Sequence, residues 1–166
     1  MENVENMENQ QDEHPSIASF RAALAEAGGA GRIVVLPESV HTAALAAQAL
    51  GCEVGAIANS LVFDCDGEPV LILTSGAHRV DTEKTAATLG RGPLRRATPE
   101  FVRTHTGHVI GGVSPIDHPR PVPTYLDTAL EQHAEIWAAA GHPAAVFSTT
   151  YDELRSMTGA DEIEVN

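Results

Sequence analysis

The chain has 166 residues, of which 43% are hydrophobic and only 4% aromatic, so it can bury one core built mainly of aliphatic side chains. A formal net charge of −13 excludes a general nucleic-acid binder, because a phosphate backbone requires a positive surface. No segment approaches the roughly 18 uninterrupted apolar residues of a membrane span, and the N-terminus lacks the basic and apolar segments of an export signal. Cys52 and Cys65 lack metal-ligand spacing and indicate free thiols, so we expect a cytoplasmic protein without a membrane or DNA partner.

Acidic residues are concentrated at the two ends of the chain. Residues 1–14 carry five acids, no Lys or Arg and no apolar periodicity, which predicts a disordered acidic tail. Residues 161–166 add three acids, and we expect an acidic C-terminal tail there, which leaves one folded domain over residues 15–160. Within residues 79–120 seven bases outnumber four acids, so this region could contact a phosphate; chance clustering on a solvated surface explains the excess equally well.

The first part of the folded region predicts two helices around a short strand. Apolar residues recur at helical intervals over residues 15–27, and two glycines end this helix. Residues 32–38 predict a short strand closed by a proline. Residues 39–51 predict an Ala-rich helix, with Ser39 as its N-cap and Thr42 as the alternative.

A hairpin and another helix follow. Asp66–Gly67 stands between two apolar segments within residues 59–76, and this pair is a strong signal for a β-hairpin. Residues 81–90 predict a helix that either Asp81 or Thr82 caps.

The remainder mixes short elements of both kinds. Residues 93–97 predict a short strand, and residues 98–107 predict a helix with proline at its first position. Residues 108–127 are rich in Gly and Pro and predict a loop flanked by short strands. Residues 128–159 predict a helical start, a strand pair that turns near residues 141–143, and a closing helix. Because strands and helices interleave irregularly around hairpins, the predicted class is α+β with a mixed, mostly antiparallel sheet.

Several familiar sites find little support. His105 and His108 have a spacing that could chelate a metal, but Gly107 breaks the helix between them and no third ligand follows. We therefore expect ordinary surface histidines, no metal and no cofactor. Trp137 lies in an apolar stretch and is expected in the core rather than on a stacking platform.

The segment "GGVSP" is more informative. Gly111 and Gly112 allow a close backbone approach that a side chain would block, and Pro115 stiffens the exit. Such a turn can offer backbone N–H groups to an oxygen that gains negative charge. An ordinary tight loop is the alternative.

The order of these segments resembles the YbaK family, also called the prolyl-tRNA-synthetase-associated domain family. The similarity extends from about residue 33 to residue 159, nearly the whole folded chain. It is carried by Ser60–Leu61, Val80–Asp81, Thr106–Gly107 and the Gly111–Pro115 loop.

The resemblance implies a single α+β domain, with a barrel-like sheet surrounded by short helices. It also implies an aminoacyl-tRNA deacylase that acts in trans and hydrolyses the ester of a mischarged tRNA without a cofactor. Its partners would be the tRNA acceptor end and, in addition, an aminoacyl-tRNA synthetase. The alternative is a non-catalytic module of the same fold, which binds an aminoacyl-tRNA 3′ end or a synthetase.

The resemblance also suggests site residues. Asn59, Gly111 and Gly112 are expected in catalysis. Substrate-binding side chains are expected at Leu36, His41, Ser60, Ser114, Pro115, Ala139, His142 and Val146. Asn59 replaces the lysine usual in the family, and the single lysine of this chain, Lys84, lies elsewhere. Asparagine can donate and accept hydrogen bonds but supplies no positive charge; a structural role as a cap of the strand is the alternative.

Overall fold

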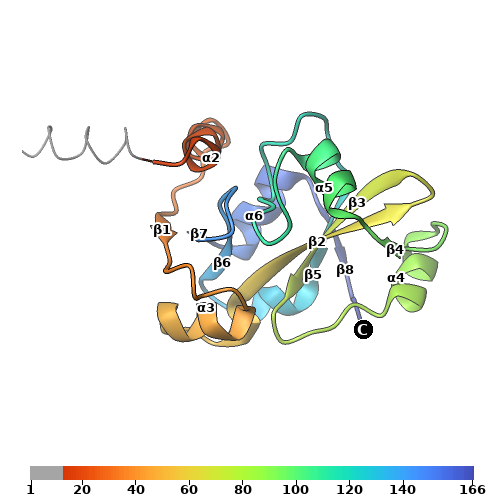
Figure 1. Ribbon diagram of the computed structural model, residues 1–166. Helices are drawn as coiled ribbons and strands as arrows, with labels where there is room; N and C mark the ends of the chain where they lie inside the picture. Colours follow the sequence, from red (N-terminus) through yellow and green to blue (C-terminus); the bar gives the residue numbers. More distant parts are fainter. Residues whose placement is uncertain (1–12) are drawn as a thin grey trace, which may run out of the picture.

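One mixed sheet organises the chain (Figure 1). The structure is a computed structural model that describes residues 13–166, and most of the expected N-terminal acidic tail lies outside the described residues. The strands are β1 (Ile33–Val35), β2 (Ile57–Cys65), β3 (Glu68–Ser75), β4 (Arg95–Arg96), β5 (Thr124–Asp127), β6 (Ile136–Ala139), β7 (Ala145–Thr149) and β8 (Asp161–Ile163). Their order is β1-β7-β6-β2-β3-β5-β8, with β4 paired to β2. Four of the seven pairings are antiparallel, which confirms the predicted mixed, mostly antiparallel sheet.

The long hairpin of β2 and β3 forms where the sequence predicts it. The strands pair along their full length, from Ala58 opposite Ser75 to Cys65 opposite Glu68. Asp66 and Gly67 form the two-residue turn, both with positive φ (52° and 89°). This conformation matches the twist of paired strands, which explains the strength of the Asp-Gly signal.

Five α-helices of the described residues surround the sheet. They are α2 (Pro15–Glu26), α3 (Ala43–Leu50), α4 (Thr82–Leu89), α5 (Pro99–Thr106) and α6 (Tyr151–Thr158), with 3-10 turns η1 (Val54–Ala56) and η2 (Thr128–Gln132). The open choices of N-cap are resolved by side-chain hydrogen bonds. Thr42 accepts from the Leu45 N–H at 3.1 Å, so α3 begins after it, and Asp81 accepts from the Lys84 N–H at 3.0 Å.

Strand β3 is buried on both faces and separates two hydrophobic cores. On one face Leu71 and Leu73 pack into the main core, which includes Phe20 and Leu24 of α2, Phe147 of β7 and Leu154 of α6. On the other face Val70 and Ile72 pack into a smaller core with Leu94 and Val165. A third core joins α3 to the start of β2 and to Trp137, so the tryptophan is buried as expected. A strand covered on both faces carries a continuous apolar run, as "PVLIL" does.

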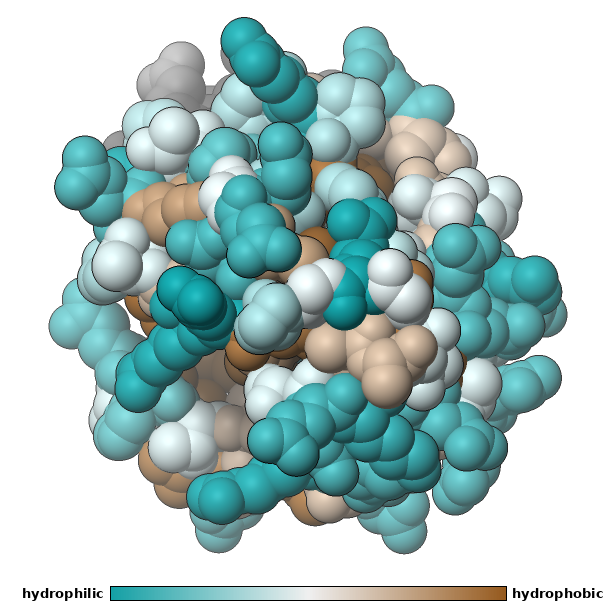
Figure 2. Space-filling model, turned by 90° about the vertical axis from the view of Figure 1, so that its right-hand side faces the viewer, coloured by the Kyte–Doolittle hydropathy of each residue, from teal (hydrophilic) through white to brown (hydrophobic). Residues whose placement is uncertain are grey.

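The face that carries α4 and β4 is mainly hydrophilic (Figure 2). Arg95 and Arg96 are exposed there, opposite the far end of β2. Two other basic residues are engaged within the protein: Lys84 donates to the Asn166 carbonyl at 2.6 Å, and Arg91 donates to the Tyr125 hydroxyl at 3.1 Å. Among the described helices, none combines the length and apolarity needed to cross a membrane.

The C-terminal residues correct one expectation. Residues 161–166, expected to form an acidic tail, contain strand β8, which pairs in parallel with β5. Ile163 and Val165 are buried, and the Val165 carbonyl accepts a hydrogen bond from the Asp81 N–H at 2.7 Å. The acids alternate with these apolar residues, so one face of the segment packs on the smaller core while the other faces solvent. The three acids of this segment favoured the prediction of a tail, although the apolar residues between them are typical of a strand.

We predict that Val165→Ala lowers the free energy of unfolding by about 2 kcal/mol, because it removes buried methyl groups and leaves a cavity. Chemical denaturation measures the change. Glu164→Gln is the matched control, since Glu164 is exposed, and should change stability by less than about 0.5 kcal/mol. Equal effects of the two substitutions would show that the C-terminal segment does not pack as described.

Candidate functional site

A cavity of about 760 Å³ opens beside the start of β2. Four segments far apart in the sequence line it: the stretch from Leu36 into α3, the first residues of β2, the loop at Ile110–Gly111, and the β6–β7 hairpin. Most of the expected site residues lie together in this lining: Leu36, His41, Asn59, Ser60, Gly111, Ala139, His142 and Val146. Gly112, Ser114 and Pro115 are not part of it.

Asn59 lies inside strand β2 rather than at its mouth. The strand begins at Ile57, two residues earlier than the apolar pattern suggests, and Asn59 is opposite Thr74 of β3. Its side chain is half-buried and makes no hydrogen bond to any residue in the range 13–166. An asparagine that capped the strand would bond nearby backbone groups. Its amide is therefore available to a molecule in the cavity.

Ser60 supplies a second unused polar group. Its Oγ is shielded from solvent and, within the described part of the chain, has no hydrogen-bond partner. A buried hydroxyl without a partner costs stability, so such groups are rare in folded proteins unless a ligand completes them. Both residues belong to the cavity lining, but they are consecutive on β2, so their side chains point to opposite faces of the sheet, and the Ser60 side chain is on the face of Leu73 and the main core.

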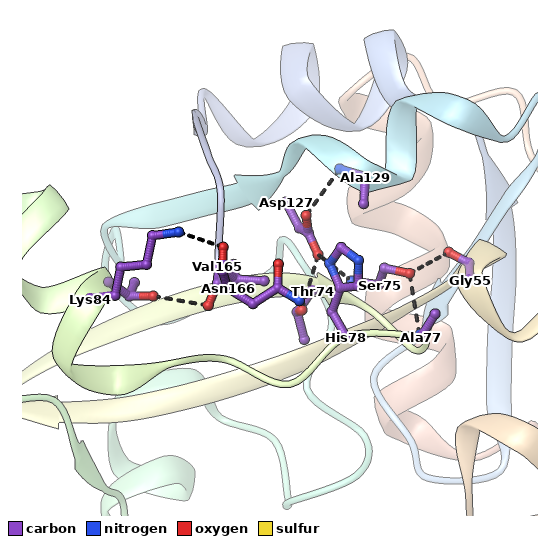
Figure 3. Close-up of polar contacts among 11 residues, drawn as sticks. Gly55, Thr74, Ser75, Ala77, His78, Lys84, Asp127, Ala129, Val165 and Asn166 are labelled. Carbon is purple, nitrogen blue, oxygen red and sulfur yellow. Dashed lines mark hydrogen bonds and ion pairs between the residues drawn. The ribbon is translucent and has the colours of Figure 1, made fainter.

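The buried carboxylate of Asp127 forms hydrogen bonds with the last two residues of β3 (Figure 3). Asp127 Oδ2 accepts from the Ser75 N–H at 3.0 Å and the Thr74 hydroxyl at 3.2 Å, and it lies 3.1 Å from His78 Nδ1. Its other oxygen accepts from the Ala129 N–H at 3.0 Å. Because Thr74 is the partner of Asn59 across the hairpin, this network fixes the strand on which the Asn59 side chain is carried.

The glycine loop approaches the cavity through a tight turn. The Gly112 N–H donates to the Val109 carbonyl at 2.9 Å, and Gly111 has a φ of +88°, as the third residue of a type II turn requires. The Gly112 N–H is thus already used, which corrects the expectation that both glycines offer free donors. For the Gly111 N–H, no partner is found in residues 13–166, and Gly111 lines the cavity.

Gly112 is required for a different reason. A Cβ atom there would lie 2.7 Å from the carbonyl carbon of His142 and 2.7 Å from the nitrogen of Pro143. The close approach that only glycine permits is therefore made to the β6–β7 turn of the same chain. Through this contact the glycine loop and the turn that carries His142 hold each other in place.

Ser114 and Pro115 lie behind the loop instead of in the cavity. Ser114 is fully buried, and its hydroxyl donates to the Ile116 carbonyl. The neighbouring His108 is also buried, which corrects its expected place on the surface. The sequence could not show this, because the chain turns back after Gly107 and covers the ring with residues 113–118.

Two histidines in the lining present different ring nitrogens. His41 Nδ1 donates to the Ser39 carbonyl at 2.8 Å, so in the neutral ring Nε2 is an acceptor. His142 Nδ1 accepts from the Ala144 N–H at 3.0 Å, so its Nε2 carries the proton and is a donor. The other expected residues, Leu36, Ala139 and Val146, contribute apolar surface.

The lining carries little charge. Glu38 is its one carboxylate, and no Lys or Arg is among the lining residues within the described chain. Arg95 pairs with Asp64, five residues along β2 from Asn59, or about 17 Å. None of the seven bases of residues 79–120 is among the residues that line the cavity. Sequence reasoning missed several lining residues that carry no motif: Glu38, Val40, Ala43, Ile110 and Pro143.

Comparison with known proteins places this geometry in a family. A solved structure described as a candidate trans-editing enzyme for prolyl-tRNA synthetase is 46% identical, with a TM-score of 0.88 over 93% of this chain and 99% of that one. The uncharacterized protein YwhH of Bacillus subtilis is 30% identical over 86% of this chain and 91% of its own length. A candidate Cys-tRNA(Pro)/Cys-tRNA(Cys) deacylase, EbsC of Enterococcus faecalis, is 28% identical over 72% of this chain and 73% of its own. Residues 37–157 match the model of the aminoacyl-tRNA editing domain, and the chain belongs to that family.

Proposed function

We propose that this protein is an aminoacyl-tRNA deacylase that acts in trans on mischarged tRNA. Membership of the editing family and the similarity to a candidate trans-editing enzyme support this activity. The structural observation that carries it is the free Asn59 amide together with the Gly111 N–H, unused within residues 13–166, in the lining of one largely apolar cavity. An aminoacyl ester fits such a site because it combines a side chain with a carbonyl group that accepts hydrogen bonds.

The reaction adds water to the ester carbonyl and releases the ribose 3′ oxygen with a proton. The carbonyl oxygen becomes negative in the tetrahedral intermediate, so donors placed around it lower the barrier. The Gly111 N–H and the Asn59 Nδ2–H are the donors that we assign to this oxygen. The apolar residues of the cavity surround the amino-acid side chain.

The charge of the cavity suits one end of the substrate. The α-amino group of an aminoacyl ester is positive, and Glu38 is the carboxylate that can attract it. No Lys or Arg of the described lining is available to the phosphate of the 3′-terminal adenosine, because position 59 is an asparagine in place of the lysine usual in the family. Charged tRNA is a cytoplasmic molecule, so we place the activity in the cytoplasm. The tRNA acceptor end is the direct partner, and the synthetase that makes the error is an indirect one.

Substitutions of Asn59 test the assignment. We expect Asn59→Ala to lower the rate of deacylation by about tenfold, because a donor to the oxyanion is lost. We expect Asn59→Lys to raise the rate for at least one mischarged tRNA, because a cation near the phosphate or oxyanion is worth roughly 1–3 kcal/mol in a partly dry site. The rates are measured over a panel of mischarged tRNAs, together with the melting temperature of each variant.

Leu61→Ala serves as the matched control, since Leu61 lies two residues after Asn59 on β2 and contributes only apolar surface to the cavity lining. It should retain most of the rate. If the wild-type protein binds charged tRNA but hydrolyses none of the panel, the non-catalytic alternative holds. If the rates of all three variants follow their melting temperatures alone, Asn59 has no catalytic role.

Gly112→Ala should abolish deacylation, because the new methyl group separates the loop from the His142–Pro143 turn and moves the Gly111 N–H. The protein should still fold, with a modest loss of stability, since the strain is confined to this contact. Val109→Ala, an exposed position in the same loop, is the control and should remain active. A folded Gly112→Ala variant with full activity would remove the loop from the mechanism.

A further inference from the structure

Two histidine rings form hydrogen bonds with the backbone of Ser114, one with its N–H and the other with its carbonyl. The Ser114 N–H donates to His108 Nδ1 at 3.4 Å, and the Ser114 carbonyl accepts from His118 Nε2 at 2.8 Å. The two rings meet edge to face, with their centroids 6.0 Å apart. Neither ring lines the candidate active site, and the proposed reaction does not use them.

The two hydrogen bonds respond differently to protonation. His118 donates through Nε2, which carries a proton in the neutral ring and in the cation alike. His108 accepts through Nδ1, which is possible only in the neutral ring. Once His108 gains a proton at Nδ1, a donor faces the Ser114 N–H and that hydrogen bond is lost, while the same Nδ1–H can donate instead to Ser114 Oγ, which lies 3.4 Å away.

Ser114 is connected directly to the active-site loop. It lies three residues after Gly111 and two after Gly112, and it is completely buried, so a shift of its backbone must move the loop. Gly112 in turn contacts the His142–Pro143 turn without room for a methyl group. The position of the Gly111 N–H in the cavity therefore depends on the His108 contact.

The surroundings favour the neutral rings. Burial lowers the pKa of His108, the His118 ring lowers it further, and Asp117 opposes the shift. Burial also lowers the pKa of His118, while its bond to Ser114 and the charge of Asp117 raise it. Asp117 is the charged side chain in the cavity of about 420 Å³ that separates these rings from α2, and it accepts from the Ser19 hydroxyl at 2.6 Å. From α2 itself, the residues that line this cavity are uncharged: Pro15, Ser16 and Ser19.

We propose that His108 is a positioning residue: its neutral ring holds Ser114 and, through it, the glycine loop in the form that binds substrate, and mild acid releases that loop. The structural part of this inference stands without the deacylase assignment. Its catalytic consequence rests on the proposed function.

Nuclear magnetic resonance tests the structural part. The ring resonances of His108 and the backbone amides of Ser114 and Gly111 are followed from about pH 8 to about pH 5. We expect the two amides to shift with the same midpoint as the His108 ring. In His108→Asn, whose side-chain oxygen accepts the same hydrogen bond but does not titrate, the two amides should lose that transition. His105→Asn, on the preceding helix, is the control and should keep it.

Deacylation over the same pH range tests the catalytic part. We expect the ratio of the wild-type rate to the His108→Asn rate to fall by about fivefold toward acid, the effect of one lost hydrogen bond. If the amides titrate with His108 but no deacylation occurs at any pH, the positioning role stands and the proposed function fails. If the amides keep their transition in His108→Asn, or show none in the wild type, the proposal is wrong. Should His108→Asn not fold, the wild-type midpoints alone decide.

Stability should depend on pH in the same direction. The folded state holds His108 at a pKa below the ordinary 6.5, so the unfolded chain binds protons more readily between these two values. Stability is then complete above about pH 6.5 and decreases as the pH falls through that value toward the folded pKa. Denaturation at each pH should show that the wild type loses stability relative to His108→Asn over this window, because asparagine does not titrate. Parallel curves would show that His108 does not carry the pH dependence.

Discussion

Strand β2 carries three pairings at once, and the remaining structure depends on them. It runs antiparallel to β3 over its full length, parallel to β6 at Ile57–Ala58, and antiparallel to β4 at Phe63–Asp64. A shift of one residue in any pairing would turn every side chain of β2 to the opposite face. The hairpin turn at Asp66–Gly67 and the buried Asp127 at the other end of β3 exclude such a shift. Asn59 and Ser60 therefore have fixed directions before any substrate is bound.

The candidate site is a meeting point of segments that are distant in the chain. Strand β2 contributes the Asn59 amide, the glycine loop contributes a backbone donor, and the β6–β7 hairpin contributes apolar walls and the His142 ring. Preorganised donors are effective because they need no rearrangement when charge develops on the substrate. The loop is held from both sides, by the His142–Pro143 turn and by the histidines at Ser114. The reaction that we propose uses these donors and water, without a nucleophilic triad.

Local signals in the sequence predicted the elements well, because each depends on neighbours along the chain. The Asp-Gly turn, the proline at the start of α5 and the apolar run of β3 all specify their structure within a few residues, whereas the N-cap of α3 is Thr42 and not the first choice, Ser39. Eight of the eleven expected site residues lie in the cavity lining, including Leu36 and Val146 on separate elements. What escaped prediction depends on long-range packing. His108 is buried only because the following loop returns over its ring. The strand at residues 161–163 forms only because one edge of β5 is open to pair with it. The use of the Gly112 N–H within its own turn follows from a backbone conformation that a Gly-Gly pair permits but does not require.

The two strands at the ends of the sheet, β1 and β8, are each only three residues long. An unpaired sheet edge is a template on which a second copy of a chain can add its own strand, and short edges limit that growth. Strand β8 adds a second obstacle, because the exposed Asp161 places a carboxylate beside its open edge, whereas the Glu162 carboxylate accepts from the Tyr151 hydroxyl at 2.8 Å and pairs with Arg155. Two copies that met there would bring like charges together. The acidic end of the chain thus opposes self-association, and raising the ionic strength, which screens exposed charges, weakens that opposition.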